Sequence, residues 1–373
     1  MASTFKNLSP NDKISTKTLL HEAIPLTGTI LSGTYTDLNI KNYSHGMFQS
    51  VYDYPYLSSS ANHIFDITVG FANDSALSAS SPVAAAQQKK KINLYNQMAQ
   101  VLVGYDKTGS IQPFDEDGNL VDGTKLKENI FLSFSRLLVK DEVKRGSFQM
   151  TVSVTGAYDP ANFGKTVVVS DFGAVNEYRI NSPVGEYGIL YASNSSGQTN
   201  IDSTKLGTGV LANHAACGLI YYQAGVVVLS GSLFTLSGSG GILSSSVDGG
   251  GSAIDFGDGF TFSDALTGSS ISSSANLLRA RIQNIQFNNT VELNSSIYFC
   301  RINHNEYNYS ANPTYLSQSQ IRVKQESSDS PVAYVTTVGL YSADNQLLAV
   351  GKLSEPLRKD PTIEYTLRAR LDY

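Results

Sequence analysis

The acidic segment 115–123 is the part of the sequence whose residue types could bind a cation. Asp115, Asp117, Asn119 and Asp122 place oxygen-bearing side chains at short intervals, as calcium-binding loops do. An EF-hand loop requires glycine at its sixth position, where this sequence has Leu120. The Asp-Gly pair at 117–118 is a strong turn signal. We therefore predict a hairpin tip with no metal, and keep these four residues as the cation alternative.

The other patterns that could carry catalysis are incomplete. Gly164-Lys165-Thr166 lacks the first glycine of a phosphate-binding loop, and the valines that follow favour a strand. No Gly-x-Ser-x-Gly elbow occurs. Cys217 follows His214 by three positions, which puts the two side chains on opposite faces of a strand. We predict no catalytic residue, no cofactor and no enzymatic activity. The histidines are too widely spaced for a local zinc motif: His21, His45, His63, His214 and His304.

The composition limits the classes of protein to which this chain can belong. The 373 residues carry a net charge of −5, and charged residues make up 16% against about 25% in average domains. The acidic balance disfavours nucleic-acid binding. Two cysteines exclude a disulfide scaffold, and together with an N-terminus that lacks an apolar run they predict synthesis in a reducing cytoplasm. The longest apolar stretch, 209–229, is interrupted by polar residues, so we expect two buried strands and no membrane span.

Strand patterns dominate the chain. Apolar and polar residues alternate over 148–154 and again over 365–373, which buries one face of a strand and exposes the other. One helix is predicted near 82–103, because Ser81 can cap it, Pro82 suits its first turn and Gly104 can end it. A second, shorter helix is expected over 16–22. The fold class is therefore mainly β, with β-sandwich-like domains, one helix near 82–103 and a Gly/Ser-rich insertion.

The segment 229–275 differs from the rest of the chain. It contains 14 serines and 10 glycines, and no Lys or Arg occurs between Lys205 and Arg279. Regularly placed apolar residues distinguish it from a flexible linker. We expect an acidic excursion of short strands and long glycine loops, either solvated or in contact with a partner.

The sequence predicts four regions. Residues 1–45 form an N-terminal arm that docks on a neighbouring protein or joins its sheet edge, and 46–155 form a β domain with the helix. Residues 156–275 form a β region with the Ser/Gly-rich acidic insertion. Residues 276–373 form a C-terminal β domain that shares a core with 46–155.

The stretch 334–356 reads as a hairpin: an apolar strand, a turn at Ser342–Asn345 and a second strand from Gln346 to Leu353. It resembles the "-GLY-(acidic turn)-LLAV-" signature of phage virion proteins, including modules that attach tail fibres to baseplates. The matching residues are Val338, Gly339, Leu340, Tyr341, Leu347, Leu348, Ala349 and Val350.

Three further segments, 19–25, 46–57 and 307–315, are similar to virion structural proteins of T4-like tailed phages that infect marine cyanobacteria. The resemblance implies a structural component of a virion, in the tail, baseplate, neck or fibre-attachment region. It implies assembly in the host bacterial cytoplasm with other virion proteins and copies of itself, as a symmetric oligomer, without nucleic-acid or membrane partners. Two alternatives are a tail component that binds or cleaves host polysaccharide and a capsid-associated decoration protein.

Aromatic residues supply interface anchors with polar handles. Tyr and Phe together make up 10% of the chain, and several lie in the segments that carry the resemblance. For Tyr52 and its neighbours, packing in the core is the alternative to an interface. The interface candidates are Tyr52, Tyr54, Tyr56, Tyr307, Tyr309, Tyr315, Leu340 and Tyr341.

Overall fold

The computed structural model divides into two compact units. Unit 1 comprises Met1–Leu20 and Glu292–Tyr373, and unit 2 comprises His21–Val291. The residues that the structure describes are 5–24, 40–52, 63–79, 85–135, 142–154, 164–248, 261–267, 270–309, 316–317, 320–321, 328 and 330–372.

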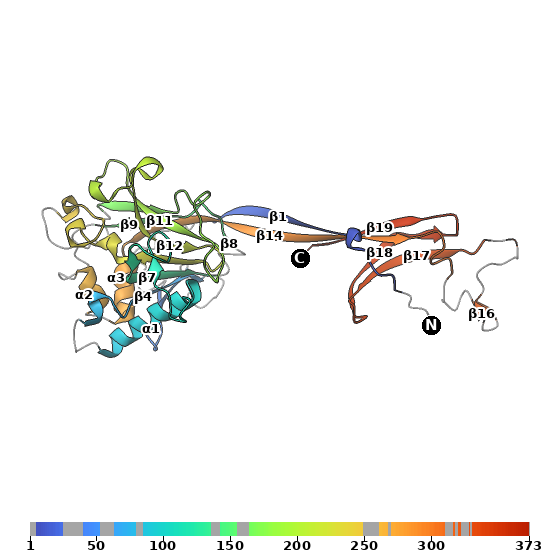
Figure 1. Cartoon of the computed structure of the whole chain (residues 1–373), viewed down its shortest axis with the longest axis horizontal. Helices are drawn as coiled ribbons and strands as arrows, with labels where there is room; N and C mark the ends of the chain where they lie inside the picture. Colours follow the sequence, from blue (N-terminus) through green and yellow to red (C-terminus); the bar gives the residue numbers. More distant parts are fainter. Residues whose placement is uncertain are drawn as a thin grey trace. The chain divides into compact units, whose positions relative to one another are not determined.

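Unit 2 is built on one antiparallel sheet, which confirms the mainly β fold class (Figure 1). Its strands follow the order β14-β9-β10-β11-β12-β13-β7-β4-β3-β2, and most neighbours in this order are also neighbours along the chain. Beside it, β5 (Phe114–Asp115) and β6 (Lys125–Leu126) form a separate short hairpin. The sheet strands are β2 (Ile40–Asn42), β3 (Gln49–Tyr52), β4 (His63–Phe71), β7 (Glu128–Phe134), β8 (Glu142–Val143), β9 (Gln149–Ser153), β10 (Thr166–Ser170), β11 (Tyr187–Asn194), β12 (His214–Tyr221), β13 (Val226–Ser230) and β14 (Ile282–Ile302).

The sheet curls so that one hydrophobic cluster collects residues from both ends of the strand order. The rings of Phe134 in β7 and Phe287 in β14 lie 4.9 Å apart, although five strands separate β7 from β14 in the sheet. Val51 of β3 and Ile285 of β14 belong to the same cluster. Closure of this kind gives unit 2 a sandwich-like interior.

The outer face of the same sheet is also buried. In β7, Ile130 and Leu132 belong to the inner cluster, whereas Phe131 between them belongs to a second cluster on the other face. The second cluster is rich in aromatic side chains, and the Tyr187 and Tyr221 rings stack at 4.9 Å. Burial on both faces explains why β12 and β13 read as continuous apolar runs, as predicted for 209–229.

The predicted helix is confirmed as α1, Ala85–Leu102. Gly104 follows it with a φ of +95°, the left-handed conformation that favours glycine after a helix. The helix approaches β4 closely at Gly70, where an added Cβ would lie 2.8 Å from the Lys91 carbonyl oxygen. Ser81 and Pro82, the expected start signals, lie outside the described residues.

From the sequence alone, the basic run at 89–91 is expected to form one solvated face of this helix, and the structure corrects this for Lys91. Its side chain is fully buried and donates hydrogen bonds to the Leu266 carbonyl oxygen and to Ser274 Oγ. Burial lowers the pKa of Lys91 to about 8. The lysine therefore joins α1 to the helices of the Ser/Gly-rich region.

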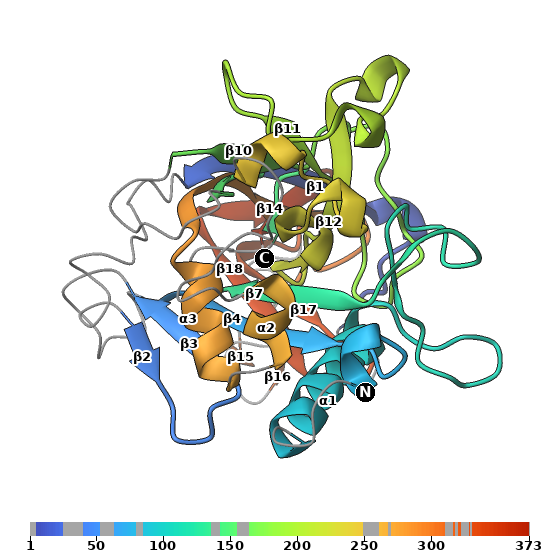
Figure 2. The ribbon, with the colours of Figure 1, turned by 90° about the vertical axis from the view of Figure 1, so that its left-hand side faces the viewer.

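The Ser/Gly-rich region contains two helices, α2 (Phe262–Thr267) and α3 (Ile271–Arg279), where short strands were predicted. Figure 2 shows α3 beside β3 and β4. Ser270 caps α3, and the buried Ile271, Ala275 and Leu278 recur at helical spacing. This helical spacing is visible in the sequence, but the many serines and glycines of the region favour loops and short strands. Upstream, single turns of 3-10 helix lie at Gly231–Phe234, Ser237–Ser239 and Ser245–Asp248.

No helix in the described ranges combines the length and the apolar character that a membrane span requires.

Unit 1 consists of extended strands. Its part of β14 pairs in antiparallel fashion with β19 (Tyr365–Asp372), and β17 (Ala333–Tyr341) pairs with β18 (Leu347–Lys359). A shorter hairpin joins β15 (Leu316–Ser317) to β16 (Gln320–Ile321). Exposure alternates along β19 as the sequence predicted.

The short helix expected over 16–22 is replaced by strand β1 (Lys13–Ile24), which neighbours β14 of the same chain (Figure 1). The β-branched Ile14, Thr16 and Thr18 alternate along it and explain this preference. Residues 13–24 thus join this chain's own sheet. The division into four regions, with boundaries at 45/46, 155/156 and 275/276, stays a prediction. The structure itself groups the chain into two compact units.

The packing of α1 on β4 yields a first test. Substitution Gly70→Ala places a Cβ against the α1 backbone and should lower the free energy of unfolding by about 1–3 kcal/mol, as overpacking does. Gly238→Ala is the control, because a Cβ there has open space around it. Denaturant unfolding measures both, and equal stability of the two variants would contradict the close approach of α1.

The buried Lys91 yields a test based on how the free energy of unfolding depends on pH. Because its pKa is about 8 in the folded chain and 10.5 in its ordinary state, the unfolded chain binds more protons between these values. Stability of the wild type should therefore rise from pH 8 to pH 10 by up to about 1.4 kcal/mol per unit relative to Lys91→Met. Parallel pH profiles for the two proteins would refute the assigned burial.

Candidate functional site

The acidic segment forms the tip of the β5–β6 hairpin, as predicted. Asp115 is buried at the base of the tip, where its carboxylate accepts hydrogen bonds from the backbone amides of Asp117 and Gly118 and forms an ion pair with Lys125. Burial acts to raise the pKa of Asp115, but the hydrogen bonds from Asp117 and Lys125 and the charge of Lys125 outweigh it and leave the pKa lowered. An ammonium group thus neutralises the carboxylate that a cation would need.

Asp117, Asn119 and Asp122 are also joined by hydrogen bonds within the tip. Asn119 Nδ2 donates to Asp117 Oδ2 at 3.1 Å and to Asp122 Oδ1 at 2.7 Å, while its Oδ1 accepts from the backbone amides of Val121 and Asp122. Leu120 takes the left-handed conformation, with a φ of +64°. Among the residues described, no cluster of three His, Cys, Asp or Glu side chains is arranged to hold a metal ion. The tip is therefore built from Asx turns, in which Asp and Asn side chains accept hydrogen bonds from backbone amides nearby in the chain.

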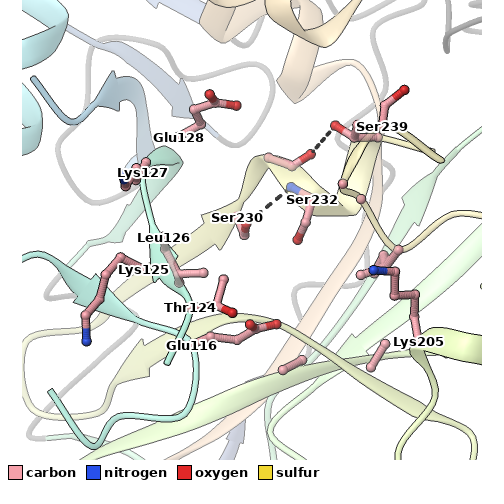
Figure 3. Close-up of a pocket in the computed structure, with 17 residues that line it drawn as sticks. Glu116, Thr124, Lys125, Leu126, Lys127, Glu128, Lys205, Ser230, Ser232 and Ser239 are labelled. Carbon is pink, nitrogen blue, oxygen red and sulfur yellow. Dashed lines mark hydrogen bonds between the residues drawn. The ribbon is translucent and has the colours of Figure 1, made fainter. Parts of the chain in front are cut away.

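A cavity of about 390 Å³ opens in unit 2 between the β5–β6 hairpin and the turns that follow β13 (Figure 3). Burial raises the pKa of Glu116 at its wall. Lysine and serine side chains complete a strongly polar lining, in which none of the residues is aromatic. The charged and hydroxylated residues of the lining are Glu116, Thr124, Lys125, Lys127, Glu128, Lys205, Ser230, Ser232, Thr235 and Ser239.

Cys217 is fully buried in β12, and burial raises the pKa of its thiol. A protonated, enclosed thiol is not a nucleophile. His214 instead stacks on Phe172, with ring centroids 4.0 Å apart. The structure therefore gives this pair a packing role. Cys300 in β14 is half-buried and is likewise a free thiol.

The interface candidates are distributed over both units. Tyr52 in β3 is 8% exposed, and burial at this position favours the core-packing alternative. Tyr307 and Tyr309, which follow β14 in unit 1, are 43% and 58% exposed. Leu340 is half-buried and Tyr341 is exposed, both in β17. Tyr54, Tyr56 and Tyr315 lie outside the described residues.

Among the residues that the structure describes in unit 1, the β17–β18 hairpin carries a group of exposed apolar side chains. Gly339 pairs with Val350, and the Tyr341 ring and the Leu347 side chain lie over Gly339. A register shift next to Tyr341 places Leu348 beside these residues. Their exposures of 44% to 68% show that each of them keeps a large part of its side chain in contact with solvent. We call this surface the apolar hairpin face and define it by Tyr341, Leu347, Leu348 and Val350.

Unit 1 lacks a hydrophobic cluster of its own in its described residues, since every member of the two clusters belongs to unit 2. Several of its buried side chains are polar. Lys359 is fully buried, and its Nζ donates to the His304 carbonyl oxygen at 3.0 Å and to Asn308 Oδ1 at 2.6 Å. Strand pairing and polar contacts therefore hold this unit together, and an isolated two-stranded hairpin is only marginally stable in water.

Of this surface, the interface candidates include only Tyr341, while the candidate Leu340 is half-buried on the other face; an interface role for either stays a prediction. Leu347, Leu348 and Val350 carry the resemblance but are not among the interface candidates. The signal that could have found them is the run of four apolar residues, 347–350, directly after a turn.

No protein-family model matches this chain, and neither the curated proteins nor the solved structures that were searched contain a similar one.

The hairpin tip yields a test of the cation alternative. Lys125→Met leaves the buried Asp115 carboxylate without its counter-ion and should lower the free energy of unfolding by about 1–3 kcal/mol. Lys127→Met is the matched control, because its ion pair with Asp74 is exposed and should cost less than about 0.5 kcal/mol.

Calcium should leave the melting temperature of the wild type unchanged, because Lys125 neutralises Asp115 and Asn119 donates to both Asp117 and Asp122. A calcium-dependent rise that EDTA reverses would instead establish Asp115, Asp117, Asn119 and Asp122 as a cation site.

Proposed function

We propose that this chain is a structural component of a tailed-phage virion, in the tail, baseplate, neck or fibre-attachment region, and that it acts by protein–protein assembly without turnover. The observation that carries the proposal is the composition of unit 1. Its described residues include an exposed apolar hairpin face and no hydrophobic cluster, so association would bury surface that the single chain leaves in water. The same hairpin carries the sequence resemblance to virion proteins.

Unit 2 suits a stable body in such a particle. Its sheet is buried on both faces, and α1 and α3 pack against β4. A body with its own core can fold before assembly, while unit 1 gains stability when partners cover it. The partners we propose are copies of this chain and other virion proteins, joined in the cytoplasm of the host bacterium as a symmetric oligomer.

A host-polysaccharide-binding tail component is the second candidate, and the polar cavity favours it. Its carboxylates and hydroxyls could accept and donate hydrogen bonds to sugar hydroxyls. Aromatic platforms, which sugar recognition commonly adds, do not occur in its lining. A capsid-associated decoration protein would use the same kind of association surface and would differ from the first proposal in its place on the particle.

The proposal predicts that peptides of this chain occur in purified virions of the phage that encodes it. Mass spectrometry of gradient-purified particles should find the chain at a constant ratio to known virion proteins, and host cytoplasmic proteins serve as the contamination control. Antibody labelling of intact particles should then mark the tail region. If the chain is absent from purified particles, the proposal is refuted, whereas head labelling would support the decoration protein.

A further inference from the structure

We infer that copies of this chain bind one another through the apolar hairpin face of unit 1. The inference rests on the proposed function and sharpens it, because it names the surface and commits to a second copy of this chain as its occupant. The surface consists of Tyr341, Leu347, Leu348 and Val350, at the end of the β17–β18 hairpin.

The exposure of these side chains is the first observation. Leu347, Leu348 and Val350 are 54%, 68% and 63% exposed, and they are neighbours in space, because the register places them around Gly339. The other face of the hairpin is different: Val338, Leu340 and Ala349 are half-buried. One face of the hairpin is thus partly packed within the chain, and the other presents apolar carbon to water.

The aromatic pair at this end of the hairpin gives the surface a defined shape. The Phe5 ring lies 4.5 Å from the Tyr341 ring, and Phe5 is itself 44% exposed. Tyr341 is therefore held from one side and keeps its other side accessible. Rigid aromatic side chains of this kind make effective interface anchors, because little conformational freedom is lost when they are covered.

The backbone of β17 offers a strand edge at which a further strand could form hydrogen bonds. Among the strands described, β17 pairs only with β18, so none of these strands lies along its second edge. An edge of this kind can accept a further strand, and proteins usually block it with charged side chains or proline. The strand Ala333–Tyr341 contains neither.

The charge pattern favours a second copy as the occupant. In a symmetric contact the same residues lie close to their own equivalents, so charged residues near the axis would repel. From Ala333 to Gly351, Asp344 in the turn is the only charged residue. An uncharged apolar strand can therefore meet its own copy at no electrostatic cost.

Cover by a partner would add apolar burial to unit 1, because its described residues form no hydrophobic cluster. Another copy of the chain is a partner that is always present at the same concentration.

The test uses the full chain. Light scattering and sedimentation over a range of concentrations should show an oligomer for the wild type. The double variant Leu348→Glu with Val350→Glu should weaken association at least tenfold, because four or more carboxylates would meet at the contact. Val210→Glu is the control: Val210 is 78% exposed in unit 2, and this variant should associate like the wild type.

Two separate cysteine variants keep the test decisive if the charged variant fails to fold. In a Cys300→Ser background, Leu348→Cys should form a disulfide between chains on mild oxidation, whereas Val210→Cys should not. A wild-type chain that stays monomeric at all concentrations, or a Leu348→Cys chain that does not cross-link, would overturn the inference. The proposed function would survive either result if the chain is found in purified virions, where another virion protein would then cover the hairpin.

Discussion

Both hydrophobic clusters of the described residues belong to unit 2, and the different ways in which the two units are stabilised depend on this difference in apolar burial. Unit 2 buries both faces of one curled sheet, with side chains such as Ile130 and Phe131 pointing alternately into two clusters. Burial at about 25 cal/mol per Å² is the main source of folding free energy, so this unit has what a self-sufficient domain needs. Unit 1 has strands and hydrogen bonds but, in its described residues, no such cluster. Strand pairing and polar contacts therefore contribute a larger share of its stability than they do in unit 2.

The elements of the fold that could be predicted are those whose pattern depends on local geometry. Alternation over 148–154 and 365–373 predicted the strands found as β9 and β19, and the glycine at 104 located the end of α1, because each feature reflects one backbone conformation. The Asp-Gly turn at 117–118 was predictable for the same reason.

The errors arose where tertiary contacts decide the structure. Lys91 looks like its solvated neighbours in the sequence, and only the arrival of α2 and α3 makes it a buried donor. Residues 16–22 were expected to form a short helix, although β-branched Thr16 and Thr18 favour a strand, and pairing with β14 completes that strand. For the candidate site, the sequence identified the hairpin but could not show which of its faces is left uncovered, because that depends on what the rest of unit 1 packs against.

The second, aromatic-rich cluster of unit 2 has a consequence for the spectroscopy of the protein. The chain contains no tryptophan, so tyrosine dominates its near-ultraviolet absorption and its intrinsic fluorescence. Tyr95, Tyr187 and Tyr221 are fixed in that cluster, and the stacked rings of Tyr187 and Tyr221 are close enough for their electronic transitions to couple. Tyr307, Tyr309, Tyr334 and Tyr341 in unit 1 are exposed to solvent. Circular dichroism near 280 nm is thus an intrinsic optical signal weighted toward unit 2, and it can be followed without any label while unit 1 changes its surroundings.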